Sequence, residues 1–199
     1  MIVARSGHRL EAIEKQLASD SLTGLRNRIG METTLHEWWQ MNRHRSTPIC
    51  GAMFDLDGFG KVSDKHGWLV GDRILHHVGQ LLLGATDAAN LVARYGGQRF
   101  ATVLSDSGPR AAVRMAEWFR QSLERATFRH EDKEILLTAC GAVTEAKSDE
   151  SYDRFLARLE ETLNEAKRAG PNRSWLNDGI KAELIESPNL GAKYTEIAV

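Results

Sequence analysis

A stretch near the middle of the chain, Arg94-Tyr-Gly-Gly-Gln-Arg-Phe100, constrains the fold more than any other segment. An apolar, β-prone run precedes it at residues 91–93, and another follows at residues 100–104. Two such runs separated by a glycine pair predict a β-hairpin, because glycine adopts the positive φ angles that a tight turn requires. Hairpin tips on a rigid scaffold often display functional side chains, and this tip carries Gln98 and Arg99.

The rest of the chain alternates between helical and strand-like segments. A near-continuous apolar run at residues 49–54 predicts a central strand buried on both faces. Hairpins mixed with helical crossovers predict an α+β fold, with a central, mostly antiparallel sheet covered by helices, as in ferredoxin-like domains. We expect helices at residues 8–18, 28–44, 70–83, 109–126 and 151–169, a strand pair at 127–146 and a closing edge strand at 174–176.

These segments predict three parts of the chain. Residues 1–18 form an N-terminal linker or signalling helix, residues 19–177 form the folded domain, and residues 178–199 form a loosely attached tail without clear periodicity. The apolar stripe of the first helix is narrow. Two readings stay open for it, packing on its own domain or forming the end of a coiled coil.

Composition excludes several classes of protein. With a net charge of −1, no overall basicity indicates binding to nucleic acid, and no polybasic run indicates binding to an anionic membrane. We find neither an apolar signal core nor an apolar run of bilayer length, and we therefore expect a cytoplasmic protein with no membrane segment. Cys50 and Cys140 lie in apolar runs, which predicts buried thiols in a reducing compartment. The seven histidines show no metal-binding spacing.

Two carboxylates follow the central strand and are candidates for metal binding. Asp55 and Asp57 are two positions apart, so on a strand they point to the same face. A carboxylate at the open end of a buried strand is a common Mg²⁺ ligand in phosphoryl-transfer sites. The alternative is that both carboxylates cap the turn into the next helix. The glycine-spaced segment at residues 58–63 could present backbone N–H groups to an anion, which is weak support on its own.

Three motifs together resemble the GGDEF family of diguanylate cyclases, and the resemblance covers residues 10–176. The segment Asp20-Ser-Leu-Thr-Gly-Leu-Arg-Asn-Arg28 matches the family pattern D-x-L-T-G-L-x-N-R at every fixed position. Phe54-Asp-Leu-Asp57 and the residues after it follow the family's D-x-D-x-F pattern, and residues 94–100 stand where R-Y-G-G-D/E-E-F belongs. The resemblance implies the nucleotide-cyclase palm fold.

Members of the family join two GTP molecules, each held by one subunit of a dimer, into cyclic di-GMP. The resemblance therefore implies a homodimer or a place in a longer sensor protein, with Mg²⁺ facing Asp55 and the carbonyl of Leu56. It also implies a nucleotide position made of phosphate-facing, guanine-reading and terminal-phosphate residues. These are, in that order, Gly58, Phe59 and Gly60; Ser63 and Asp72; and Lys167.

Departures from the family pattern concern the residues that would carry the reaction. Gly96 and Gly97 are present, but Gln98 and Arg99 replace the two acidic residues of the signature. An amide and a guanidinium shift the local charge by about two units toward positive, and arginine cannot lose its proton to relieve the repulsion of a metal. The expected Mg²⁺ site is therefore weakened.

Further departures affect the nucleotide and inhibitory positions. Gly60 stands at a lysine position and Ser63 at the guanine-reading asparagine position, and Pro171 stands at an arginine position after Lys167. The product-inhibition motif R-x-x-D reads Asp87-Ala-Ala-Asn90. An aspartate cannot grip a phosphate as arginine does, so cyclic di-GMP is disfavoured at the inhibitory site.

These observations predict a degenerate GGDEF domain without diguanylate cyclase activity, which acts as a GTP-binding or regulatory and dimerising module. One alternative is an active diguanylate cyclase with an atypical signature loop. The other is a pure protein-interaction module.

Overall fold

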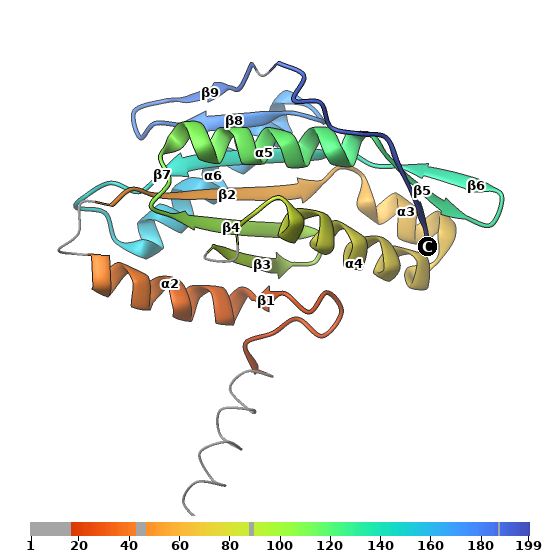
Figure 1. Cartoon of the computed structure of the whole chain (residues 1–199), viewed down its shortest axis with the longest axis horizontal. Coiled ribbons are helices and arrows are strands. Elements are labelled where there is room, and N and C mark those ends of the chain that lie inside the picture. Colours follow the sequence, from red (N-terminus) through yellow and green to blue (C-terminus); the bar gives the residue numbers. More distant parts are fainter. Residues whose placement is uncertain (1–16, 43–46, 88–89, 187) are drawn as a thin grey trace, which may run out of the picture.

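The computed structural model describes residues 17–42, 47–87, 90–186 and 188–199. Its seven-stranded sheet has the order β1-β3-β4-β2-β7-β8-β9, and helices cover both faces (Figure 1). Neighbouring strands are antiparallel except at β1–β3 and β7–β8. The expected α+β fold is confirmed. The strands of this sheet are β1 (Arg26–Asn27), β2 (Ile49–Leu56), β3 (Leu91–Gly96), β4 (Arg99–Ser105), β7 (Ala139–Glu145), β8 (Ser174–Asn177) and β9 (Ala182–Leu184).

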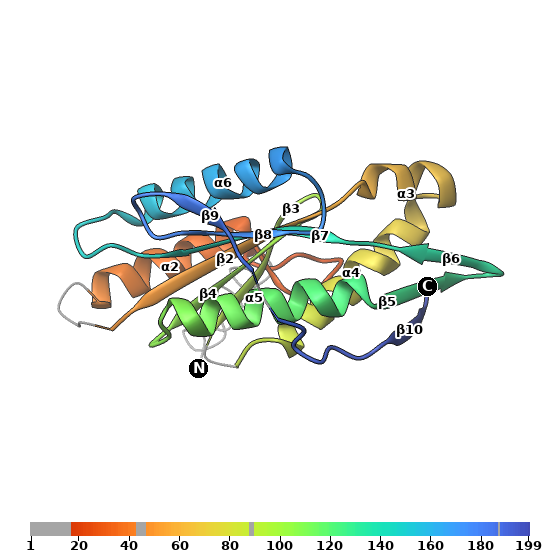
Figure 2. The same cartoon turned by 90° about the horizontal axis from the view of Figure 1, so that it is seen from above.

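The sheet divides the protein interior into two apolar cores, one on each face, and helices cover each core. On one face lie α4 (Trp68–Gly84) and α5 (Pro109–Glu124), and on the other lie α2 (Arg28–Asn42) and α6 (Tyr152–Ala169), as Figure 2 shows for α5 and α6. Cys50 belongs to the first core and Cys140 to the second. Both are free and buried, and burial raises the pKa of each thiol to about 12.

Strand β2 is the centre of the sheet, and all eight of its residues are buried, as the apolar run predicted. It pairs with β4 on one side and β7 on the other. The β2–β4 register places Asp55 directly opposite Arg99. Directly opposed side chains in an antiparallel pair lie about 5 Å apart at Cβ, so this register alone brings the carboxylate and the guanidinium together.

The predicted hairpin is present as β3 and β4, with Gly96 and Gly97 at φ angles of 149° and 56°. Local sequence also explains the ends of α6. The Ser151 side chain accepts a hydrogen bond from the Arg154 N–H at its start, and Gly170 followed by Pro171 ends it.

Several elements differ from the prediction. The glycine-spaced segment contains a helix of its own, α3 (Phe59–His66), because Gly58 takes the left-handed conformation that begins it. Residues 127–146 hold parts of three strands rather than two, and β8 is not an edge because β9 pairs with it. The expected helix at residues 8–18 lies outside the described residues, apart from residues 17 and 18. The additional strands are β5 (Ala126–His130), β6 (Lys133–Leu136) and β10 (Thr195–Ala198).

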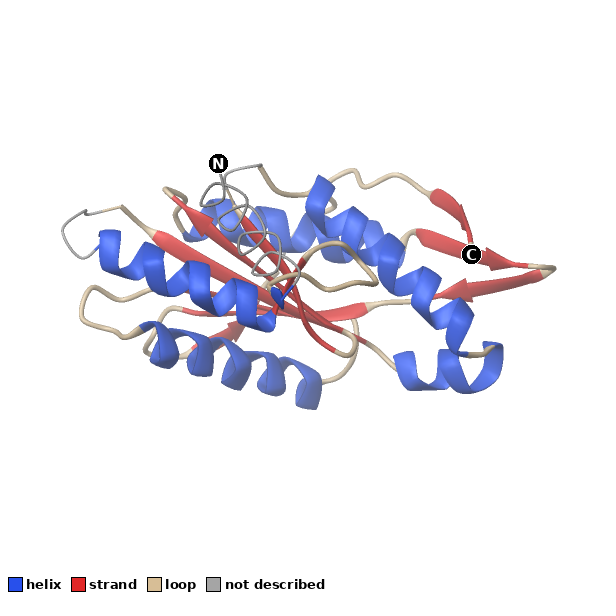
Figure 3. Ribbon diagram, turned by 90° about the horizontal axis from the view of Figure 1, so that it is seen from below, coloured by secondary structure: helices blue, strands red, loops and turns tan. Residues whose placement is uncertain are grey.

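The C-terminal segment is attached more firmly than expected. Strand β10 pairs in parallel with β5 and forms a second sheet with the β5–β6 hairpin, which projects beside the main sheet (Figure 3). The Val199 N–H donates to the Arg129 carbonyl at 2.9 Å, and the Val199 side chain is buried. Long-range strand pairing has no local sequence signal, which is why the segment resembled a loose tail. No helix among the described residues has the length and apolarity needed to cross a membrane.

Candidate functional site

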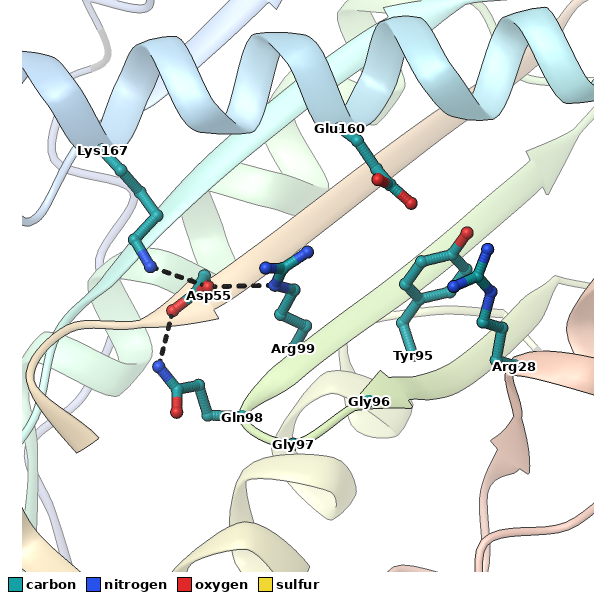
Figure 4. Close-up of a pocket in the computed structure, with 9 residues that line it drawn as sticks. All are labelled: Arg28, Asp55, Tyr95, Gly96, Gly97, Gln98, Arg99, Glu160 and Lys167. Atoms are coloured by element: carbon teal, nitrogen blue, oxygen red, sulfur yellow. Dashed lines mark hydrogen bonds and ion pairs between the residues drawn. The ribbon is translucent and has the colours of Figure 1, made fainter. Parts of the chain in front are cut away.

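An open pocket of about 460 Å³ lies where the tip of the β3–β4 hairpin meets the end of β2 (Figure 4). Helix α6 forms its other wall. The tip of the hairpin therefore lines a cavity, as expected for a turn that displays functional side chains. The pocket is lined by Arg28, Asp55, Tyr95, Gly96, Gly97, Gln98, Arg99, Glu160 and Lys167.

Asp55 lies at one end of the pocket, and its side chain is only 3% exposed. Its Oδ1 accepts a hydrogen bond from the Gln98 amide at 3.1 Å. Its Oδ2 faces two cations, with Arg99 Nε at 3.2 Å and Lys167 Nζ at 2.8 Å (Figure 4). A buried carboxylate is tolerated when it is paired and hydrogen-bonded in this way.

The ionic balance around Asp55 favours an anion. Asp55, Arg99 and Lys167 together carry one net positive charge. Leu56, the other predicted metal position, is buried, and its N–H donates to the Gln98 carbonyl at 3.3 Å. Across the described residues, no group of three aspartate, glutamate, histidine or cysteine side chains converges in a way that could hold a metal ion.

Asp57 does not join Asp55 in the pocket but holds the turn that follows α6. Its Oδ2 accepts from the Asn172 N–H at 2.8 Å and from the Thr138 hydroxyl at 2.7 Å. Its Oδ1 accepts from the Cys140 thiol at 3.3 Å. These bonds tie the end of β2 to the segment just after Lys167. The contacts of Asp57 match neither expectation, because its carboxylate lies outside the pocket lining and holds the turn after α6 instead of the turn from β2 into α3.

A second set of contacts braces the hairpin from outside. Arg94 donates from Nε to the Gly97 carbonyl at 2.8 Å and pairs through Nη1 with Asp20 at 3.2 Å. Asp20 also accepts from the Thr23 N–H and hydroxyl. Burial opposes ionisation of Asp20, but the Thr23 hydrogen bonds and Arg94 outweigh it and lower the pKa of this carboxyl. The two motifs that are farthest apart in sequence are therefore one structural unit.

Sequence reasoning missed three residues that line the pocket: Arg28, Tyr95 and Glu160. The Arg28 guanidinium lies 4.8 Å from the centre of the Tyr95 ring and pairs with Glu32 at 2.7 Å. Burial and the nearby Glu160 carboxylate raise the pKa of Tyr95. A signal for Glu160 existed, since it precedes Lys167 by seven residues and so lies on the same face of a helix.

The other predicted nucleotide-binding residues lie outside the lining of this pocket. Gly58 has φ 64° and begins α3, and an added Cβ at Gly58 or Gly60 would meet open space. Phe59 is buried. The Ser63 hydroxyl lies 2.7 Å from where a Cβ on Gly71 would be, which places Ser63 against the residue before Asp72. Helices α3 and α4 therefore meet at Ser63 and Gly71, the residue that precedes Asp72 in the chain.

At the predicted inhibitory position, Asn90 has a structural partner. Its Oδ1 accepts from the Ser105 N–H at 3.3 Å, and its own N–H donates to the Asp87 carbonyl at 3.0 Å. Asn90 therefore connects the end of this loop to the end of β4.

Comparisons with known proteins agree with the motifs and the fold. A family model described as "Diguanylate cyclase, GGDEF domain" matches residues 17–173. Diguanylate cyclase DosC of Escherichia coli K12 is 30% identical over 166 residues, which are 82% of this chain and 36% of that protein. Diguanylate cyclase DgcP of Pseudomonas aeruginosa is 26% identical over 164 residues, 82% of this chain and 24% of that protein.

Solved structures show the same architecture. The coiled coil and GGDEF domain of DgcB from Caulobacter crescentus, in complex with c-di-GMP, has a TM-score of 0.82 at 25% identity and covers 88% of this chain and 93% of its own. Diguanylate cyclase SiaD from Pseudomonas aeruginosa, in complex with its activator SiaC, has a TM-score of 0.77 at 27% identity, covering 88% of this chain and 70% of its own.

Curated relatives are longer than the present sequence, which spans between 24% and 50% of the length of eight that it matches. The family model nevertheless covers most of the chain, and so does the structural likeness, which covers 88% of it. The chain belongs to the GGDEF family of diguanylate cyclase domains, the family of cyclic di-GMP signalling.

Proposed function

We propose that this GGDEF domain lacks diguanylate cyclase activity and acts as a GTP-binding or regulatory and dimerising module in cyclic di-GMP signalling. The observation that carries the proposal is the state of Asp55. Its Oδ1 accepts a hydrogen bond from Gln98, and its Oδ2 pairs with Arg99 and Lys167. Gln98 and Arg99 stand where the family has acidic residues. The carboxylate that should bind a metal is thus enclosed by donors.

Loss of the reaction follows from the charge requirements of phosphoryl transfer. Catalysis of this chemistry depends on positioning and on neutralising negative charge, which is usually the work of Mg²⁺. A metal at Asp55 would have to displace Lys167 and would lie beside a guanidinium that stays charged. The residues present do not fit a strong Mg²⁺ site, and a weakened site is part of the proposal.

Retention of GTP binding is supported by the parts of the nucleotide position that remain open. Gly58 and Gly60 leave free space at the start of α3, where backbone N–H groups of a helix begin. Ser63 and Asp72 come from adjoining helices, and Lys167 faces the same pocket as the hairpin tip. Cyclic di-GMP at Asp87 and Asn90 is not part of the proposal, because Asp87 repels phosphate.

The experiment is incubation of the purified chain with GTP and Mg²⁺, followed by chromatography for cyclic di-GMP, with an active diguanylate cyclase as positive control. No product at high protein concentration is the expected result. Product above the protein-free control would overturn the proposal and establish the alternative of an active cyclase with an atypical loop.

Calorimetry with GTP decides the binding part of the proposal. We expect measurable heat in the wild type and weaker binding in Lys167→Ala, with Arg168→Ala as the matched control. The Arg168 guanidinium donates to the Asn164 carbonyl of its own helix rather than into the pocket. Absence of binding with and without Mg²⁺ would leave the alternative of a pure interaction module. Light scattering after size-exclusion chromatography tests the dimer, and a monomer at all concentrations would contradict it.

A further inference from the structure

Side-chain cations already neutralise the carboxylate of Asp55 at its end of the pocket. Asp55 is 3% exposed, whereas Arg99 and Lys167 are 44% and 38% exposed and face the open pocket. A divalent cation arriving at Asp55 would meet two positive charges. A phosphate arriving at the same place would meet donors that Asp55 already orients.

Both cations retain unused hydrogen-bond donors. Arg99 contacts Asp55 through Nε alone, and within the described part of the chain its two terminal nitrogens have no partner. Figure 4 shows these nitrogens on the side of the guanidinium that faces α6. Lys167 has three N–H donors and directs one of them at Asp55. A planar guanidinium binds phosphate oxygens in a bidentate manner, and an ammonium adds a point charge.

The other end of the pocket sets a limit on where the anion can lie. Glu160 lies beyond Arg99, next to Tyr95, and its negative charge opposes an anion there (Figure 4). Arg28 is occupied by Glu32 at 2.7 Å. The anion position is therefore confined to the space between the Arg99 terminal nitrogens and Lys167.

We propose that this pocket binds the terminal phosphates of a nucleoside polyphosphate without a divalent cation, with Arg99 and Lys167 in the place of the metal. The inference rests on the proposed GTP binding and makes it more specific. Free Mg²⁺ neutralises a polyphosphate in solution, so it should weaken binding or leave it unchanged. A site that relies on bound Mg²⁺ would behave in the opposite way.

Isothermal titration calorimetry with GTP, in EDTA and in MgCl₂ at equal ionic strength, tests the inference. We expect binding in EDTA to be at least as tight as in MgCl₂. Arg99→Gln should weaken binding in EDTA about 10-fold or more, since a charge-assisted hydrogen bond is lost. Arg99→Lys should retain part of the affinity because it keeps the charge. Arg168→Gln, one residue from Lys167 and turned to its own helix, should bind as the wild type does.

Inorganic tripolyphosphate serves as a second probe that lacks a base and a sugar, so failure of the inference can be separated from failure of GTP binding. Binding of GTP only in the presence of Mg²⁺ would overturn the inference and leave the nucleotide function standing. Binding of tripolyphosphate in EDTA, dependent on Arg99, would support the anion site even if GTP failed to bind. Absence of binding of both probes in both buffers would overturn the site and the nucleotide function together.

Discussion

Exchanging both hairpin-tip residues for glutamate, Gln98→Glu with Arg99→Glu, tests the charge argument most directly. In the native chain, Asp55, Arg99 and Lys167 carry one net positive charge, and the double exchange turns this into two net negative charges. In metal-free buffer we expect a decrease of about 1–2 kcal/mol in the free energy of unfolding. The value is small because Arg99 is 44% exposed, so solvent screens both the lost ion pair and the new repulsion.

Magnesium should recover that loss in the double variant. Three carboxylates around one point supply the oxygen ligands that Mg²⁺ prefers. A ligand that binds only the folded state stabilises it by about 1.4 kcal/mol at ten times its dissociation constant. Urea unfolding, followed by tryptophan fluorescence in EDTA and in MgCl₂ at equal ionic strength, measures both effects. The wild type should show equal stability in the two buffers.

A matched control separates the site from general charge effects. Gln40→Glu with Arg110→Glu makes the same two exchanges at exposed positions of α2 and α5 and should give no response to Mg²⁺. We expect no cyclic di-GMP from the tip variant, because Gly60, Ser63 and Pro171 still differ from the family pattern. Stabilisation of the wild type by Mg²⁺ as large as that of the tip variant would refute the reasoning, and so would a tip variant that ignores Mg²⁺.

Three further predictions concern the frame around the site. Asp57→Ala should lower stability by about 1–3 kcal/mol, because partly buried donors lose their acceptor, and Asp57→Asn should be less affected. Chemical denaturation that shows no loss would contradict this. Gly97→Ala should cost about 1–2 kcal/mol at φ 56°. Gly108→Ala at φ −78° should cost less in thermal melting, because alanine adopts this backbone without strain and loses only part of the N-cap preference for α5. Burial opposes ionisation of Glu150, but its contacts with Arg158 outweigh burial and lower the pKa of this carboxyl. Glu150→Gln should therefore have a lower free energy of unfolding than the wild type at neutral pH, and the difference should shrink as the pH falls below 4.5, the ordinary pKa of glutamate. A difference that does not depend on pH would exclude this linkage.

Local patterns in the sequence were sufficient for the hairpin, the buried central strand and most helices. Gly96 and Gly97 are needed where the backbone turns with positive φ, and the apolar run of β2 records burial on both faces of the sheet. Short-range signals did not predict α3, because the glycine spacing at its start is not typical of a helix. They also missed β10, because its pairing with β5 depends on residues about 70 positions apart.

The sequence alone was sufficient to identify the family from its three motifs, and to show that Gln98 and Arg99 stand where the family has two acids. The sign of the change in charge follows from these residue types. Only the tertiary structure decided what that change does. The β2–β4 register brings Arg99 onto Asp55, and α6 brings Lys167 onto the same oxygen. Asp57, which looked equivalent to Asp55 in sequence, is turned to the Asn172 backbone. Residue types specify which charges exist, but strand register and helix packing set the distances between them, and electrostatic energy depends on those distances and on burial.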